Sequence, residues 1–263
     1  GGTRGARFPP MQHRCRPTPV TSWFWPLPSA GRAPGHPGAR GDCFRVFMQA
    51  DAPPAQLFRS AEPIPVDIPL RCRCGHMRGV ASNVSPSNGL RFICYCKDCQ
   101  AFARFLERAD VLDPAGGTDI FQMPPARVKL TAGTDAMRSL RFSNKVLRWY
   151  TDCCRTPVAN TAAGPSFPVI GVVHSFMDHE VDGRSRDEAL GPPLCRLYER
   201  SAVGPLPPNA PGPPSLGAYA GHASKILGWW MCGLNRPTPF FDDRTKAPRA
   251  VPRVLTRSER AAV

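Results

Sequence analysis

The chain has 263 residues, 42% of them hydrophobic, so it can bury the core of one large domain or two small ones. Its 32 prolines and 23 glycines make up about a fifth of the chain and predict many loops. The formal charge is +14, and no run of 18 uncharged apolar residues occurs, which excludes a membrane-spanning helix.

Residues 1–47 differ in composition from the rest of the chain. They contain eight prolines and seven arginines, a single acidic residue (Asp42) and no periodic apolar pattern. Such a segment cannot bury enough apolar surface to offset the entropy lost on ordering it. We therefore expect either a disordered N-terminal extension or translated upstream sequence before a start at Met48.

Residues 48–182 are predicted to form a β domain. Short apolar stretches separated by Pro-Pro, Gly-Thr-Asp and Ser-Asn breakers are typical of antiparallel strands. A short helix is expected after Cys99, because Phe102, Phe105 and Leu106 recur at helical spacing. The predicted strands are 66–70, 77–81, 90–95, 120–123, 127–131, 139–142, 146–150 and 169–176.

Seven of the eleven cysteines fall into three clusters: Cys72 with Cys74, Cys94 with Cys96 and Cys99, and Cys153 with Cys154. Cysteines so close in sequence can share one Zn²⁺ at about 2.3 Å, whereas joining them as disulfides causes strain. We therefore expect a cytoplasmic protein, in a reducing compartment, with one or two zinc ions per chain. The isolated cysteines are expected to be buried as small apolar side chains: Cys15, Cys43, Cys195 and Cys232.

The middle cluster supplies three thiolates within six residues. Three protein ligands leave a fourth position open, as in catalytic zinc sites. Cys72 and Cys74 supply only two ligands and need a partner from elsewhere in the chain. Cys153 and Cys154 are the obvious source.

Residues 183–215 form a proline- and glycine-rich connector, and residues 216–263 are predicted to be a helical segment. Five apolar side chains fall on one face of an amphipathic helix: Ile226, Leu227, Trp230, Met231 and Leu234. We expect this face to dock on the β domain. A membrane-surface helix would require a strongly basic polar face, which this segment lacks.

The motifs Cys72-Arg-Cys74-Gly and Cys94-Tyr-Cys96-Lys-Asp-Cys99 lie about twenty residues apart. They resemble the glutathione-dependent formaldehyde-activating enzyme family, which includes centromere protein V-type proteins. That family continues with a strand ending in C-x-x-C-G, which the segment 151–155 resembles, with threonine for the first cysteine and arginine for the glycine. The resemblance covers roughly residues 66–176, and the tail looks like that of a related group of uncharacterised bacterial proteins.

The resemblance implies a β-rich fold of small antiparallel sheets, β-tent-like, around two zinc sites. The implied structural site uses Cys72, Cys74 and Cys154, with Cys153 or the carboxylate of Asp152 as a further ligand. The implied second site has an open or thiol-occupied position and uses Cys94, Cys96 and Cys99.

The resemblance also implies carbon–sulfur lyase-type chemistry, in which a small thiol such as glutathione binds at the second zinc and its adduct with an aldehyde forms or breaks. Arg73, Lys97 and Arg155 each adjoin a cysteine ligand, so their charges could hold the carboxylates of that thiol. His76 is a further candidate ligand or acid–base group. No nucleophile–base pair can be identified in the sequence, so the catalytic residues stay unassigned.

Two other functions remain open. The first is a non-catalytic zinc module, in which metal replaces part of the core. The second is a nucleic-acid or chromatin binder, suggested by the charge of +14 and the centromere-type relatives. Scattered arginines, with no run of four basic residues, argue against nucleic acid. Exchange of a metal ligand with added thiol would distinguish the enzyme from the module, and steep salt dependence would indicate a nucleic-acid binder.

Overall fold

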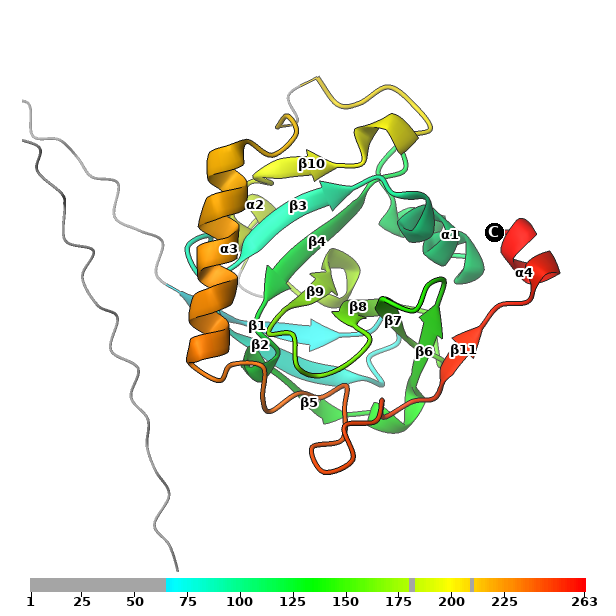
Figure 1. Cartoon of the computed structure of the whole chain (residues 1–263). Helices are drawn as coiled ribbons and strands as arrows, with labels where there is room; N and C mark the ends of the chain where they lie inside the picture. The colour runs from blue at the N-terminus through cyan, green and yellow to red at the C-terminus, as the bar shows by residue number, and fades with distance from the viewer. Residues whose placement is uncertain (1–64, 180–182, 209–210) are drawn as a thin grey trace, which may run out of the picture. The chain divides into compact units, whose positions relative to one another are not determined.

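The computed structural model describes residues 65–179, 183–208 and 211–263. The expectation for residues 1–47 lies outside these ranges. Within them the fold is mainly β, with two sheets and few helices, as the sequence predicts (Figure 1). No helix in the described ranges is long and apolar enough to cross a membrane.

The smaller sheet has three antiparallel strands in the order β1 (Val66–Arg71), β2 (Arg78–Val84) and β5 (Val128–Ala132). Alternation along β1 places Ile68 and Leu70 in the core. The turn between β1 and β2 carries Cys72 and Cys74. Gly75 follows them with a φ of +74°, a backbone conformation that glycine adopts without steric cost.

The larger sheet has eight strands in the order β10, β3, β4, β9, β8, β7, β6 and β11. Their bounds, in that order, are Cys195–Leu197, Leu90–Cys94, Thr118–Met123, Ile170–Val173, Pro157–Ala162, Val146–Thr151, Met137–Arg141 and Pro252–Val254. The two edge pairs, β10 with β3 and β11 with β6, are parallel. The expected antiparallel pattern is therefore wrong at both edges. Both edge strands return over long connections, so no tight turn forces the antiparallel direction.

Strand β8 is not evident from the sequence. It begins at Pro157 and places the polar Asn160 and Thr161 among alanines. In the structure it lies between β7 and β9 and pairs with both. Burial of Val158 and Ala159 in this central position outweighs the low strand propensity of the segment.

Both sheets contribute to one hydrophobic core. Trp149 of β7 is fully buried, and its ring centroid lies 5.0 Å from that of Phe240 and 5.9 Å from that of Phe241. Its indole N–H donates a hydrogen bond to Thr161 Oγ1 at 3.0 Å. Burial of each such aromatic side chain contributes about 1.5–3 kcal/mol, so these contacts fix the C-terminal segment to the larger sheet.

The described ranges contain four α-helices: α1 (Lys97–Phe105), α2 (Arg186–Leu190), α3 (Leu216–Met231) and α4 (Arg257–Ala261). Five short 3₁₀ turns cover Ala109–Val111, Pro125–Arg127, Thr134–Ala136, His174–Phe176 and Glu199–Ser201. Helix α1 confirms the short helix expected after Cys99, although it begins two residues earlier, at Lys97. Capping boxes begin both short helices, with Ser185 and Glu188 at α2 and Thr256 and Glu259 at α4.

Helix α3 occupies the first part of the segment 216–263 predicted to be helical, but residues 232–256 are not helical and include strand β11. The buried face of α3 also differs from the predicted one. Leu227 and Trp230 are 55% and 61% exposed, whereas Trp229 is buried. The ammonium of Lys225 donates a hydrogen bond to the carbonyl of Gly89 at 3.0 Å, just before β3. The face that carries Lys225 and Trp229 therefore holds the helix. The predicted docking face is wrong because α3 is apolar on more than one side, so periodicity alone does not decide which side packs.

Candidate metal centre

Four cysteines come together between the β1–β2 turn and the β7–β8 turn, one turn from each sheet. The sulfur atoms of Cys72, Cys74, Cys153 and Cys154 all lie within 4.8 Å of one another. Neighbouring sulfurs are separated by 3.4, 3.5, 3.8 and 3.9 Å. Four sulfurs at about 2.3 Å from one zinc ion form a tetrahedron with edges of about 3.8 Å. The first cysteine group could therefore hold one tetrahedral metal ion.

The fourth sulfur of this group comes from Cys153, and the alternative ligand Asp152 points elsewhere. The carboxylate of Asp152 pairs with Arg138 at 3.0 Å, whereas Cys153 Sγ lies 3.4 Å from Cys74 Sγ. Arg155 adopts a φ of +54°, the left-handed region that favours glycine. The turn therefore places an arginine in a backbone conformation that favours glycine.

Buried threonines orient Cys154. Thr156 Oγ1 accepts hydrogen bonds from the backbone N–H of Arg73 at 3.0 Å and from Arg108 at 3.2 Å, so its hydroxyl proton is left for Cys154 Sγ at 3.1 Å. Thr151 Oγ1 lies 3.4 Å from the same sulfur. Burial opposes ionisation of Cys154, but these hydroxyl groups outweigh it and lower its pKa to about 5. The thiolate is the form that binds metal.

The second cysteine group lies at the junction of β3 and α1. Cys94 ends β3, Cys96 is the N-cap of α1, and Cys99 is in its first turn, with the three sulfurs within 4.8 Å of one another. Cys96 Sγ accepts a hydrogen bond from the backbone N–H of Cys99 at 3.4 Å. Hydrogen bonds from the thiols of Cys94 and Cys99 lower the pKa of Cys96 to about 2. This group could also hold a metal ion, with one tetrahedral position left for another ligand.

Comparison with known protein families assigns the chain to one family. A model described as a family of unknown function (DUF6151) matches residues 65–249, which include all seven clustered cysteines. The chain belongs to the DUF6151 family. A search of curated proteins gave no match. Membership of DUF6151 thus carries no activity with it.

Arg148 is a functional candidate in this DUF6151 protein that the sequence analysis missed. Its side chain is 7% exposed, and Nη1 lies 3.5 Å from Cys99 Sγ and 3.1 Å from Asn160 Oδ1. Nη2 lies 3.9 Å from Asp98. Burial would lower the pKa of Arg148, but the neighbouring Cys99, Cys96 and Asp98 together outweigh it and raise the pKa above its usual value. The available signal was an isolated arginine within an apolar strand, since a buried charge requires a partner.

The three predicted substrate-binding residues are not brought together. Arg73 and Arg155 adjoin the first group, whereas Lys97 begins α1 beside the second group, and all three are exposed. The guanidinium of Arg155 pairs with Glu107 at 2.6 Å. The structure therefore divides these residues between the two sulfur groups.

The structure also shows where His76 and two of the isolated cysteines lie. His76 lies 3.5 Å from the carboxylate of Asp135 and belongs to neither sulfur group. Cys195 is buried against the second group, as expected for a small apolar side chain. Cys232 is exposed at the end of α3, so burial was wrong there. Cys15 and Cys43 lie outside the described residues.

A large cleft opens on the face of the larger sheet opposite to the second cysteine group. Its volume is about 760 Å³, and it is lined by Arg91 and Ile93 of β3, by Tyr95 directly after the strand, and by His174. Because side chains alternate along a strand, Cys94 points to the opposite face. This cleft of the DUF6151 domain is therefore separated from the second cysteine group by the sheet itself.

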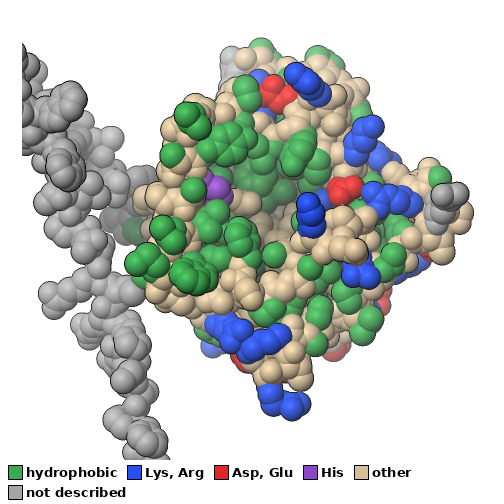
Figure 2. Space-filling model, viewed as in Figure 1, with side chains coloured by type: hydrophobic (Ala, Val, Ile, Leu, Met, Phe, Trp, Pro, Cys, Tyr) green, Lys and Arg blue, Asp and Glu red, His purple; other side chains and the backbone are tan. Residues whose placement is uncertain are grey.

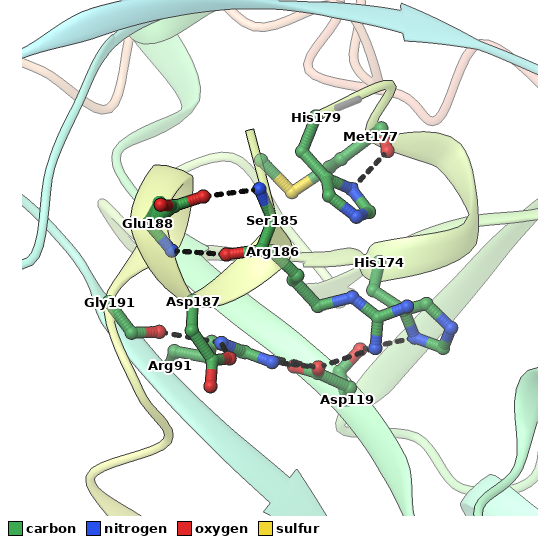
Figure 3. A network of polar contacts seen from close by, with 10 residues as sticks. All are labelled: Arg91, Asp119, His174, Met177, His179, Ser185, Arg186, Asp187, Glu188 and Gly191. Carbon is green, nitrogen blue, oxygen red and sulfur yellow. Dashed lines mark hydrogen bonds and ion pairs between the residues drawn. The ribbon is translucent and has the colours of Figure 1, made fainter. Parts of the chain in front are cut away.

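A buried ionic network lies in the wall of this large cleft (Figure 3). Arg91 donates hydrogen bonds to Asp119 at 2.7 Å, Asp187 at 2.6 Å and the carbonyl of Gly191 at 2.6 Å. Arg186 adds a contact to Asp119 at 3.0 Å. Burial opposes ionisation of Asp119, but Arg91 outweighs it and holds the pKa below its usual range. The network therefore holds α2 against β3 and β4.

Proposed function

We propose that this protein binds two zinc ions and that the second accepts a small thiol, such as glutathione, as its fourth ligand. The first ion would be structural and held by Cys72, Cys74, Cys153 and Cys154. The second would be held by Cys94, Cys96 and Cys99. The observation that carries the proposal is that three sulfurs from one short segment lie together beside the buried cation Arg148, with no fourth ligand grouped with them among the described residues.

The charges of the second group support this proposal. Three thiolates and one Zn²⁺ carry a net charge of −1, which the guanidinium of Arg148 offsets at close range. When bound, zinc lowers the pKa of a thiol ligand and so supplies thiolate at neutral pH. Cys94 and Cys99 are each 5% exposed, so the chain keeps water from most of the ligand set.

The proposed reaction is the reversible addition of the thiol to an aldehyde. The thiolate sulfur attacks the carbonyl carbon, a C–S bond forms, and the π electrons of C=O move to oxygen, which takes a proton from water. In the reverse direction the hydroxyl loses that proton and the C–S bond breaks. The resemblance to formaldehyde-activating enzymes supports this assignment, and the cysteine geometry is compatible with it.

Metal content is the first test. Full-length protein purified under reducing conditions should contain two zinc ions per chain, and Cys74→Ser and Cys96→Ser should each reduce this to one. In cobalt-loaded Cys74→Ser protein, added glutathione should change the sulfur-to-metal charge-transfer absorption. Two metals with absorption that no thiol alters would instead support the non-catalytic zinc module. Absence of metal, with the clustered cysteines found as disulfides, would overturn both functions.

A further inference from the structure

A second, smaller cleft lies on the same face of the larger sheet as the second cysteine group. Its volume is about 310 Å³, at the lower end of the roughly 300–1,000 Å³ typical of small-molecule sites. Phe92 and Ile120 line the small cleft, and the same two side chains pack against Cys94 and Cys99. Asn160 lines both this cleft and the narrow cavity beside Cys99. The cleft therefore adjoins the proposed thiol site.

The walls of the small cleft are mainly apolar. Five large apolar side chains line it: Phe92, Ile120, Val146, Phe167 and Val169. Figure 2 shows a hollow in this face surrounded by hydrophobic side chains. Glutathione carries two carboxylates and an ammonium, which would lose hydration against such walls without compensating hydrogen bonds. The lining thus favours a thiol with an apolar body.

Four polar residues also line this cleft: Gln122, Lys145, Asn160 and Thr161. Lys145 is exposed, and within the described ranges its ammonium has no ion-pair or hydrogen-bond partner. Its Cα lies three residues before that of Arg148 on the chain leading into β7, about 10 Å along the backbone at the rise of an extended strand. An unpaired cation that lines the small cleft suits an anion at the end of the ligand opposite its sulfur.

We propose that the small cleft binds a thiol with an apolar body and a terminal carboxylate. The body packs against Phe92 and Ile120, the carboxylate pairs with Lys145, and the sulfur lies at the second cysteine group. The position of the sulfur rests on the proposed function, whereas the contacts of the body and the carboxylate depend on the cleft alone.

Three thiols test this selectivity by calorimetric titration of the zinc-loaded full chain: 4-(mercaptomethyl)benzoate, the neutral 4-methylbenzyl thiol, and glutathione. The benzoate should bind about ten-fold more tightly than glutathione. Lys145→Ala should weaken binding of the benzoate about ten-fold, the scale of one charge-assisted hydrogen bond, and leave the neutral thiol unchanged. Lys129→Ala, which removes an exposed lysine from β5 in the other sheet, is the matched control and should change neither.

A ligand without sulfur, 4-ethylbenzoate, separates this inference from the proposed function. If no thiol alters the cobalt spectrum but 4-ethylbenzoate binds in a Lys145-dependent way, the thiol function fails and the cleft assignment stands. If glutathione binds as tightly as the mercaptobenzoate, or Lys145→Ala weakens the neutral thiol equally, the cleft assignment is overturned. Failure of both benzoates to bind also overturns it, whatever the metal does.

Discussion

The two cysteine groups use the same side chain but close very different lengths of chain. In the first, Cys72 and Cys153 are 81 positions apart and join turns that belong to different sheets. In the second, Cys94 and Cys99 lie within a single strand-to-helix junction. Closing a long loop removes far more freedom from the unfolded chain than closing a short turn. The first group is therefore placed to stabilise the fold, whereas the second links only a local segment.

The side chains that contact the two cysteine groups also differ. Neutral hydroxyls of Thr151 and Thr156 contact the first group, whose four sulfurs complete a tetrahedron. A buried guanidinium, that of Arg148, contacts the second, which has three. A closed ligand set is typical of structural zinc and an incomplete one of exchangeable zinc.

The largest expected effect is on thermal stability. Cys74→Ser should lower the unfolding temperature by on the order of 10–20 °C, because the metal that links the two sheets is lost. Cys96→Ser should lower it by less than half as much, since the second group links only a local segment. Calorimetry of both metal-loaded variants measures the difference. Equal decreases in unfolding temperature would show that the first group stabilises the fold no more than the second does.

The next largest effect is expected on metal affinity at the second cysteine group, when the buried Arg148 is replaced. Arg148→Gln should weaken metal binding there about 10- to 100-fold, because it removes the charge that offsets the thiolates. Competition with a chelator measures this in the Cys74→Ser background, which retains the second group alone. Arg138→Gln changes an exposed arginine on the neighbouring strand β6 and should have no such effect. An unchanged affinity in Arg148→Gln would remove Arg148 from the site.

A smaller effect is expected when a threonine hydroxyl that contacts the first cysteine group is removed. Thr156→Val keeps the shape of the side chain but leaves the buried guanidinium of Arg108 and the N–H of Arg73 without their acceptor. The free energy of unfolding should fall by about 1–3 kcal/mol. Metal affinity should fall at the first centre only. Thr131→Val, at an exposed site on β5, should stay within about 0.5 kcal/mol of the parent.

The smallest effect is expected at Arg155. Its ion pair with Glu107 is largely exposed, with the two side chains 51% and 79% accessible. Arg155→Ala should therefore change the free energy of unfolding by less than about 1 kcal/mol. Thiol affinity at the second group should also be unchanged, because Arg155 adjoins the first. A weakened thiol affinity would instead restore the sequence-based hypothesis that this arginine holds the carboxylates of the thiol.

Much of the fold class and of the candidate metal sites could be predicted because both depend on local patterns. Short apolar stretches between breakers indicate strands wherever they finally pair. Cysteines two or three positions apart can reach one ion irrespective of the rest of the fold. By contrast, β8 and the parallel edge strands β10 and β11 are stabilised by neighbours distant in the sequence, so local propensity does not reveal them.

The sequence by itself determined that this is a mainly β protein whose seven clustered cysteines can form metal sites. Only the tertiary structure decided that Cys153, and not Asp152, completes the first sulfur group, and that Arg148 faces the second. It also decided which side of α3 is buried. The physical reason is distance along the chain: spacing within a turn limits which atoms can share an ion, whereas strand register and sheet packing determine which remote side chains meet them.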